Sequence, residues 1–86
     1  MKDKLIKEYI DKITINDVIS FGNKNGISLN NEEALLVLKY IKNDWRTIIY
    51  GNPNSILSDL KTHLGNKYIK IEQLYTYFKN KYKDLL

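Results

Sequence analysis

The residue types that most often carry out chemistry in proteins are sparse in this sequence. It has one histidine, His63, and no cysteine. Ser55 and Ser58 have no histidine at a spacing typical of a nucleophile and its base, and no zinc-protease, phosphate-loop or serine-hydrolase motif occurs. Glu32 and Glu33 are the one adjacent pair of acids, and a helix start explains them. The sequence therefore predicts no enzyme, no catalytic residue, no metal, no cofactor and no small-molecule substrate.

A second group of candidate residues lies toward the C-terminal end. Between Lys61 and Lys83 the chain has six lysines and one acid. Helical spacing aligns some of these lysines with a tyrosine, and the candidate basic face consists of Lys67, Lys70, Tyr77, Lys81 and Lys83. Lysines can hold phosphates while a tyrosine ring stacks on a base, as in many single-strand and RNA binders. A nucleic-acid-binding accessory protein is thus one hypothesis.

The same residues also have a purely structural explanation. Lysines near the C-terminal end of a helix are favoured by the helix dipole, and tyrosine is common at half-buried edges. Thirteen of the fourteen basic residues are lysines, a bias that an AT-rich genome produces without selection on function. Both explanations of the basic face are open at this stage.

The apolar residues favour a different class of function, a protein-interaction module. Apolar residues make up 43% and aromatic residues 12% of the 86-residue chain, which is a generous supply for a domain of this size. Trp45, Tyr50 and Tyr68 are predicted near helix ends, where not all of them can be covered. Because aromatic side chains dominate interface energetics, we expect a partner protein or a second copy of this chain.

The candidate surfaces must be positioned by a long central helix over residues 31–50. Asn30 stands three residues before Glu33, the pattern of a capping box, in which each side chain pairs with a backbone N–H at the helix start. Gly51 gives the residue type that commonly ends a helix. The helix is apolar most of the way round, so several sides need covering, and Trp45 is predicted to be buried.

Four further helices are predicted around the central one. They cover about residues 2–12, the segment from a cap at Thr14 to Gly26, the segment from residues 52–55 to Gly65, and the segment from about Ile69 to the end. No linker, repeat or low-complexity tract separates them. The sequence therefore predicts an all-α fold, a compact single-domain bundle of about five short helices over residues 1–86.

The inward faces of the first two helices follow from their apolar spacing. On the first helix the stripe is Leu5, Ile6, Tyr9, Ile10 and Ile13, and on the second it is Ile15, Val18, Ile19 and Phe21. Outward charges on the first helix are spaced to pair one turn apart, namely Asp3 with Lys7, Lys7 with Asp11, and Glu8 with Lys12. Gly22 lies within the second helix, and we expect another helix to approach it closely.

The second and third helices invite comparison with the DNA-reading helix-turn-helix. Gly22 and Gly26 resemble the small-residue position and the turn of that motif. Asn25 and Glu32, however, fall where the motif needs buried apolar side chains. The acids at the start of the third helix would also face phosphate. An ordinary helical hairpin is the prediction.

The cellular setting follows from residue types that are missing. Without cysteine there is neither a disulfide framework nor a thiolate metal site, which favours a reducing compartment. The sequence contains no apolar run of about 18 residues and no signal-peptide pattern. The net charge of +4 is modest. We expect a cytoplasmic protein without a membrane partner.

Three stretches carry a resemblance to a known family. The segment KITINDVISFGNKNGISLNNEEA, followed by Trp45 and the ending YIKIEQLYTYFKNKY, resembles the YqfT-like proteins, short proteins of low-GC Gram-positive bacteria. The resemblance spans nearly the whole chain and rests on caps, a turn glycine and apolar spacing. It implies a bacterial, cytoplasmic, single-domain helical protein, and it implies no activity or functional residue.

Overall fold

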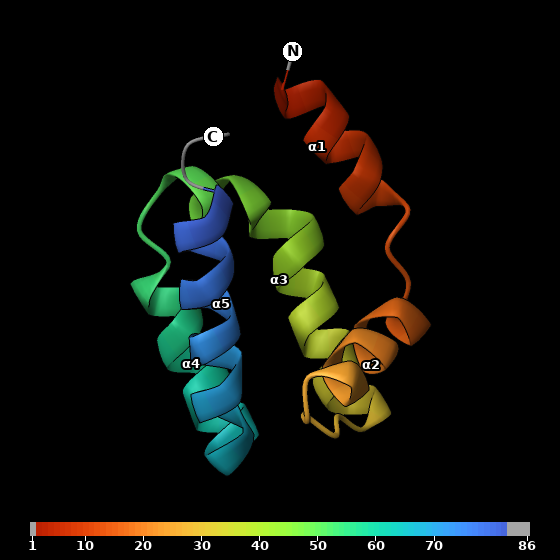
Figure 1. Ribbon diagram of the computed structural model, residues 1–86, viewed down its shortest axis with the longest axis vertical. Helices are drawn as coiled ribbons and strands as arrows, with labels where there is room; N and C mark the ends of the chain where they lie inside the picture. Colours follow the sequence, from red (N-terminus) through yellow and green to blue (C-terminus); the bar gives the residue numbers. More distant parts are fainter. Residues whose placement is uncertain (1, 83–86) are drawn as a thin grey trace. The chain divides into compact units, whose positions relative to one another are not determined.

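All regular secondary structure is helical in the part of the chain that the computed structural model describes, namely the backbone of residues 2–82 and the side chains of residues 3–77 and 80. The helices are α1 (Lys2–Asp11), α2 (Ile15–Lys24), α3 (Asn31–Tyr50), α4 (Asn54–Leu64) and α5 (Tyr68–Tyr82), with a short 3₁₀-helix η1 (Gly65–Lys67) between the last two (Figure 1). The predicted all-α class is confirmed.

Two compact units make up the chain, residues 1–45 and residues 46–86. The helix α3 contributes to both units because it runs across the division between them. Asp44, next to this division, has non-helical backbone angles (φ −126°, ψ 21°), so α3 is kinked there. The bounds of α3 agree with the predicted helix over residues 31–50. The kink was not predicted, since α3 contains neither proline nor glycine.

The helices α2 and α3 both begin with a capping box. At α2, the Asp17 N–H donates to Thr14 Oγ1 (3.1 Å) and the Thr14 N–H donates to Asp17 Oδ2 (2.9 Å). At α3, the Glu33 N–H donates to Asn30 Oδ1 (2.8 Å) and the Asn30 N–H donates to Glu33 Oε1 (2.9 Å). These bonds satisfy backbone donors that a helix start leaves unpaired. The capping role predicted for Glu33 is confirmed.

The turn between α2 and α3 depends on Gly22. The Ile27 N–H donates to the Gly22 carbonyl over 2.8 Å, and a Cβ on Gly22 would lie 2.8 Å from the Ile27 carbonyl oxygen. The close approach expected at Gly22 is therefore made by the backbone of the next turn, not by another helix. Asn25 and Glu32 are exposed, which fits an ordinary hairpin better than a DNA-reading motif.

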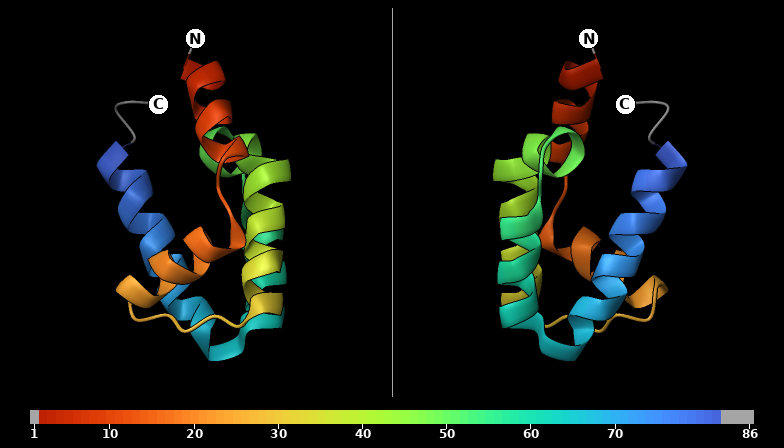
Figure 2. Two further views of the ribbon diagram at one scale, coloured as in Figure 1. Left: turned by 90° about the vertical axis from the view of Figure 1, so that its right-hand side faces the viewer. Right: turned by 90° about the vertical axis from the view of Figure 1, so that its left-hand side faces the viewer.

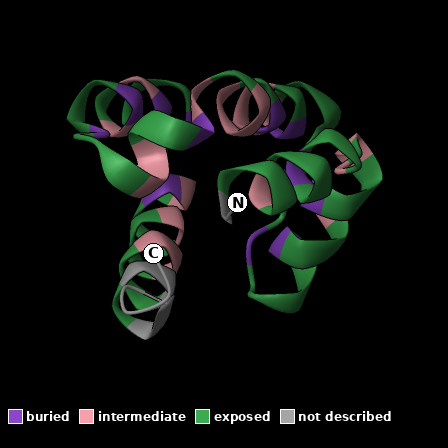
Figure 3. Cartoon of the chain, turned by 90° about the horizontal axis from the view of Figure 1, so that it is seen from above, coloured by how far each residue is buried: buried purple, intermediate pink, exposed green. Residues whose placement is uncertain are grey.

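The first unit is held together by buried apolar residues from three helices and the turn. They are Ile10, Val18, Ile27, Leu29, Ala34, Leu38 and Trp45 (buried residues are purple in Figure 3). In addition, the Lys42 ammonium donates to the backbone carbonyls of Ile10 (3.3 Å) and Asp11 (3.0 Å). A cation at this position compensates the negative end of the α1 dipole, and the Ile10 carbonyl accepts a second hydrogen bond from the Ile13 N–H (3.1 Å). The helix α3 therefore holds α1 at that end.

Two residues predicted to face inward on α1 are exposed. Leu5 is 68% exposed and Tyr9 is 73% exposed, whereas Ile10 is buried. Phe21 of α2, also predicted to face inward, is exposed as well. Four residues of the predicted stripe lie on α1, since Ile13 follows the end of the helix. These four span a wider arc than one neighbouring helix can bury, so only the side that bears Ile10 is covered.

In the second unit, α4 and α5 form a hairpin that turns through η1 (Figure 2). Gly65 ends α4 with a positive φ of 57°, and its position agrees with the predicted stop. The helix α5 begins at Tyr68, one residue before the predicted start. The Tyr75 hydroxyl donates to the Ile48 carbonyl over 3.4 Å. The buried residues of this unit are Pro53, Ile56, Leu60, Leu64 and Tyr68.

Trp45 is 5% exposed, so its predicted burial is confirmed. Trp45→Ala should lower the free energy of unfolding by about 3–5 kcal/mol, because it removes a large buried ring and leaves a cavity. That is a large part of the stability of a small domain. Urea or thermal unfolding followed by circular dichroism measures the change.

Thr47→Ala is the matched control for this substitution, since Thr47 is exposed on the same helix. It should change the free energy of unfolding by no more than about 0.5 kcal/mol. An unchanged melting temperature in Trp45→Ala would contradict the core role of the ring and would make Trp45 a candidate anchor for a partner.

Candidate interaction surfaces

Three members of the predicted basic face have described side chains. Lys67 ends η1 and is half-buried, whereas Lys70 and Tyr77 are exposed. Because Lys70 and Tyr77 are seven residues apart on α5, they share one side of that helix. Lys81 has its backbone in α5 but its side chain lies outside the described residues, and Lys83 lies outside them entirely. The structure therefore brings Lys70 and Tyr77 to one side of α5.

The surface beside Tyr77 is not uniformly basic. A shallow depression on α5 is lined by Glu72, Gln73, Thr76 and Tyr77. The Glu72 carboxylate accepts a hydrogen bond from the Tyr68 hydroxyl (2.8 Å). A carboxylate at this position repels a phosphate group that approaches the tyrosine ring. The depression thus combines one acid with uncharged polar groups and the exposed face of a ring.

Tyr68 has a structural role that the sequence did not predict. It is buried, as Trp45 is, whereas Tyr50 is exposed. Of the three aromatic residues predicted near helix ends, only Tyr50 is thus available at the surface. Burial raises the pKa of the Tyr68 hydroxyl, and the hydrogen bond to Glu72 raises this pKa further. The hydroxyl therefore remains a donor that fixes the Glu72 carboxylate one turn along α5.

The single histidine makes only local contacts on α4 among those that the structure records. Nδ1 of His63 lies 2.9 Å from the Asp59 carbonyl oxygen and 3.3 Å from Asp59 Oδ1, one turn earlier. The Thr62 hydroxyl donates to the Ser58 carbonyl over 3.1 Å. Within the described residues, no group of three or more histidine, aspartate or glutamate side chains is placed to hold a metal ion.

The most exposed large apolar side chains lie on α1. Leu5 and Tyr9, which we call the α1 face, are spaced by four residues and so lie next to each other on one side of the helix. Their spacing predicts that both face the core, and this prediction is wrong. The width of the apolar stripe in the sequence could have indicated this exposure. A helix that packs on one side only buries a narrower arc than the stripe covers.

The opposite side of α1 is occupied by contacts within the chain. Lys42 binds the carbonyls at the end of the helix, and the Lys7 ammonium lies 2.8 Å from Asp11 Oδ2. The predicted pairing of Lys7 with Asp11 is therefore confirmed. The hydrogen bond from Lys7 lowers the pKa of the Asp11 carboxyl below its usual value, and the positive charges of Lys7 and Lys42 act in the same direction. The Lys7–Asp11 pair is itself exposed, so the orientation of α1 follows from the Lys42 contact and from the burial of Ile10.

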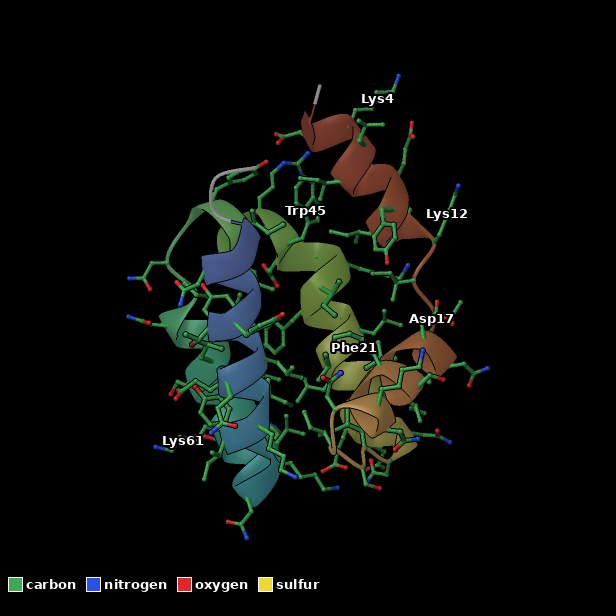
Figure 4. All side chains as sticks on the ribbon, in the orientation of Figure 1. Lys4, Lys12, Asp17, Phe21, Trp45 and Lys61 are labelled. Atoms are coloured by element: carbon green, nitrogen blue, oxygen red, sulfur yellow. The ribbon has the colours of Figure 1, made fainter. Side chains whose placement is uncertain are left out.

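Two charges border the α1 face. Lys4 precedes Leu5 and Glu8 precedes Tyr9, and both charged side chains are exposed. The structure gives neither Lys4 nor Glu8 a side-chain hydrogen bond or ion pair with another described residue. Figure 4 shows the Lys4 side chain extending away from α1. A cation and an anion thus lie side by side next to two exposed apolar side chains.

Comparison with known proteins adds no functional assignment to these surfaces. The chain matches no protein-family model, no curated protein and no solved structure. Among the described helices, none combines the length and the apolar character needed to cross a membrane. The α1 face and the Lys70–Tyr77 side of α5 are therefore judged on their own geometry.

The raised pKa of Tyr68 predicts a loss of stability in alkali. In the unfolded chain this hydroxyl ionises near its usual pKa of about 10, whereas in the folded chain it stays protonated to a higher pH. The contribution of the protonated Tyr68 hydroxyl to the free energy of unfolding is therefore present below about pH 10 and declines as the pH rises above that value. Tyr68→Phe should be less stable than the unchanged chain near neutral pH by about 0.5–1.5 kcal/mol, because the hydrogen bond is lost. The difference should shrink in alkali.

Urea unfolding over a series of pH values measures this difference. Tyr77→Phe is the control, because it removes a hydroxyl from an exposed position of the same helix. It should retain the alkaline decline of the unchanged chain. A stability difference between Tyr68→Phe and the unchanged chain that stays constant as the pH rises would contradict the assignment.

Proposed function

We propose that this protein is a protein-interaction module that binds through the α1 face. One observation carries the proposal: Leu5 and Tyr9 are adjacent on one helix and are 68% and 73% exposed. Removing a side chain of this kind from water contributes about 1.5–3 kcal/mol. Tyrosine is also among the residues that most often dominate binding energy at interfaces. A partner that covers both side chains would gain from each of them.

The stability of α1 supports the same proposal. The helix is held at its C-terminal end by buried Ile10 and by the Lys42 ammonium. The apolar pair therefore sits on a helix that is ordered before any partner arrives, which lowers the entropy lost on binding.

The setting we propose is a cytoplasmic, single helical domain over residues 1–86, related to the YqfT-like proteins, since the chain has no cysteine and no linker tract.

The proposal predicts that Leu5→Ala with Tyr9→Ala weakens binding without unfolding the protein. The two side chains are exposed, and alanine favours a helix, so the free energy of unfolding should change by no more than about 0.5 kcal/mol. Self-association, or retention of a partner from a bacterial extract, should fall by about tenfold or more, because two interface side chains are lost. Sedimentation and pull-down at matched concentrations measure both.

Leu35→Ala is the matched control, because it removes an apolar side chain that is 47% exposed on α3 of the same unit. It should leave the association and the partner unchanged. A protein that neither self-associates nor retains a partner through Leu5 and Tyr9 would overturn the proposed function.

A second candidate function is nucleic-acid binding by α5. The observation that favours it is the exposure of Lys70 and of Tyr77 on one side of that helix, with Tyr77 at 55%. A cation and a ring in this arrangement can contact a phosphate and stack on a base. Glu72, which lines the same shallow depression as Tyr77, adds a negative charge that works against it. We rank this function second for that reason.

This second candidate predicts salt-sensitive binding to single-stranded RNA or DNA. The affinity should fall steeply with added salt, because each phosphate contact releases a counterion. Tyr77→Ala and Lys70→Gln should both weaken binding, while Glu72→Gln should strengthen it by removing the repelling charge. Fluorescence anisotropy with a labelled oligonucleotide measures the affinity. The absence of any binding at low salt excludes this function.

A further inference from the structure

We infer that the α1 face pairs with the α1 face of a second copy of this chain, with the two helices antiparallel and Glu8 of each copy opposite Lys4 of the other. The inference rests on the proposed function and names its partner. It starts from the two apolar side chains and from Lys4 and Glu8, which border them on the exposed side of α1 and form no side-chain hydrogen bond or ion pair with another described residue.

The spacing of these residues fixes the geometry of the pair. Successive side chains on a helix are about 100° apart, so Leu5 and Tyr9 differ by about 40° and share one side. Lys4 and Glu8 also differ by about 40° and lie together on one flank of the apolar pair. Suppose that two such helices pack antiparallel about a two-fold axis that passes beside Ile6. Each Leu5 then lies between Leu5 and Tyr9 of the second copy, as a side chain does in a helical coiled coil.

The charges favour this antiparallel arrangement over a parallel one. With the axis beside Ile6, Glu8 lies opposite Lys4 of the second copy, and the symmetry creates the same ion pair twice. In a parallel pair Lys4 would face Lys4 and Glu8 would face Glu8, which is repulsive.

The other flank of α1 cannot take part in the same way. Ile10 is buried there, and Lys42 of α3 binds the carbonyls of Ile10 and Asp11. The charges of the far side, Lys7 and Asp11, already pair with each other over 2.8 Å. Only the flank that bears Lys4 and Glu8 is open to a neighbouring helix.

The same charges argue against other occupants. Lys4 and Glu8 cancel, so a strongly acidic or basic partner, such as a nucleic acid or an anionic lipid surface, gains little from this flank. A second copy, in contrast, presents each charge with its opposite. Two single helices form an interface below about 1,200 Å², the range of weak complexes, so we expect a dimer that dissociates on dilution.

Charge exchange on the full chain tests the inference. Lys4→Glu makes the flank acidic, and Glu8→Lys makes it basic, so each single variant should dimerise roughly five- to tenfold more weakly than the unchanged chain. The double variant Lys4→Glu/Glu8→Lys restores opposite charges in the antiparallel pair and should recover the dimer. An equimolar mixture of the two single variants should form a mixed dimer for the same reason. Sedimentation equilibrium over a range of protein concentrations measures each case, and circular dichroism checks that each variant is folded.

Two results would overturn the inference outright. The first is an unchanged chain that stays monomeric at every concentration, and the second is a dimer that neither the charge variants nor Leu5→Ala/Tyr9→Ala weaken. If the chain is a monomer and Leu5→Ala/Tyr9→Ala lowers its melting temperature, the α1 face is covered within its own chain. A monomer that retains a different protein through Leu5 and Tyr9 would also overturn the pairing while leaving the proposed function standing. Loss of both self-association and partner retention would overturn the two together.

Discussion

The close contact of Gly22 with Ile27 is the constraint on which the first unit depends. The Ile27 N–H reaches the Gly22 carbonyl over 2.8 Å, and the Ile27 carbonyl oxygen occupies the space where a side chain at residue 22 would begin. The chain can therefore reverse immediately after α2 and bury Ile27 and Leu29 against the helices on either side. Glycine costs about 1 kcal/mol in a helix relative to alanine. The burial of two large apolar side chains, at about 1.5–3 kcal/mol each, offsets that cost.

This turn sets the start of α3, and α3 in turn sets the orientation of α1. Three turns along α3 from its cap at Asn30, Lys42 meets the last carbonyls of α1. Because the contact is made at one end and on one side of α1, the helix buries Ile10 and leaves Leu5 and Tyr9 in solvent. The exposed apolar pair is thus a consequence of how the unit is assembled, since α1 has more apolar residues than α3 can cover.

The sequence predicted the features that depend on neighbours in the chain. It predicted the cap at Thr14, the capping box at Asn30, the stop at Gly65 and the burial of Trp45. These follow from local hydrogen bonding, backbone freedom and the apolar density of one helix. It did not predict which apolar residues face outward, because Leu5 and Ile10 belong to one stripe and only packing separates them. For the same reason the sequence did not predict which of Trp45, Tyr50 and Tyr68 stays uncovered, and in the structure it is Tyr50. The kink at Asp44 had no signal in residue type.

Comparison of the two candidate surfaces shows why charge alone is a poor guide in this chain. The lysines of the C-terminal segment dominate the sequence, yet beside Tyr77 the structure places Glu72, which is fixed there by the Tyr68 hydroxyl. On α1 the net charge is unremarkable, yet one cation and one anion border two apolar side chains that nothing in the described chain covers. Apolar burial contributes to binding in any salt, whereas exposed charge pairs are screened within about 10 Å at 0.1 M salt. A surface that combines an apolar centre with balanced charges at its border can gain affinity from the apolar centre and select its orientation with the charges, and the exposed side of α1 has that combination.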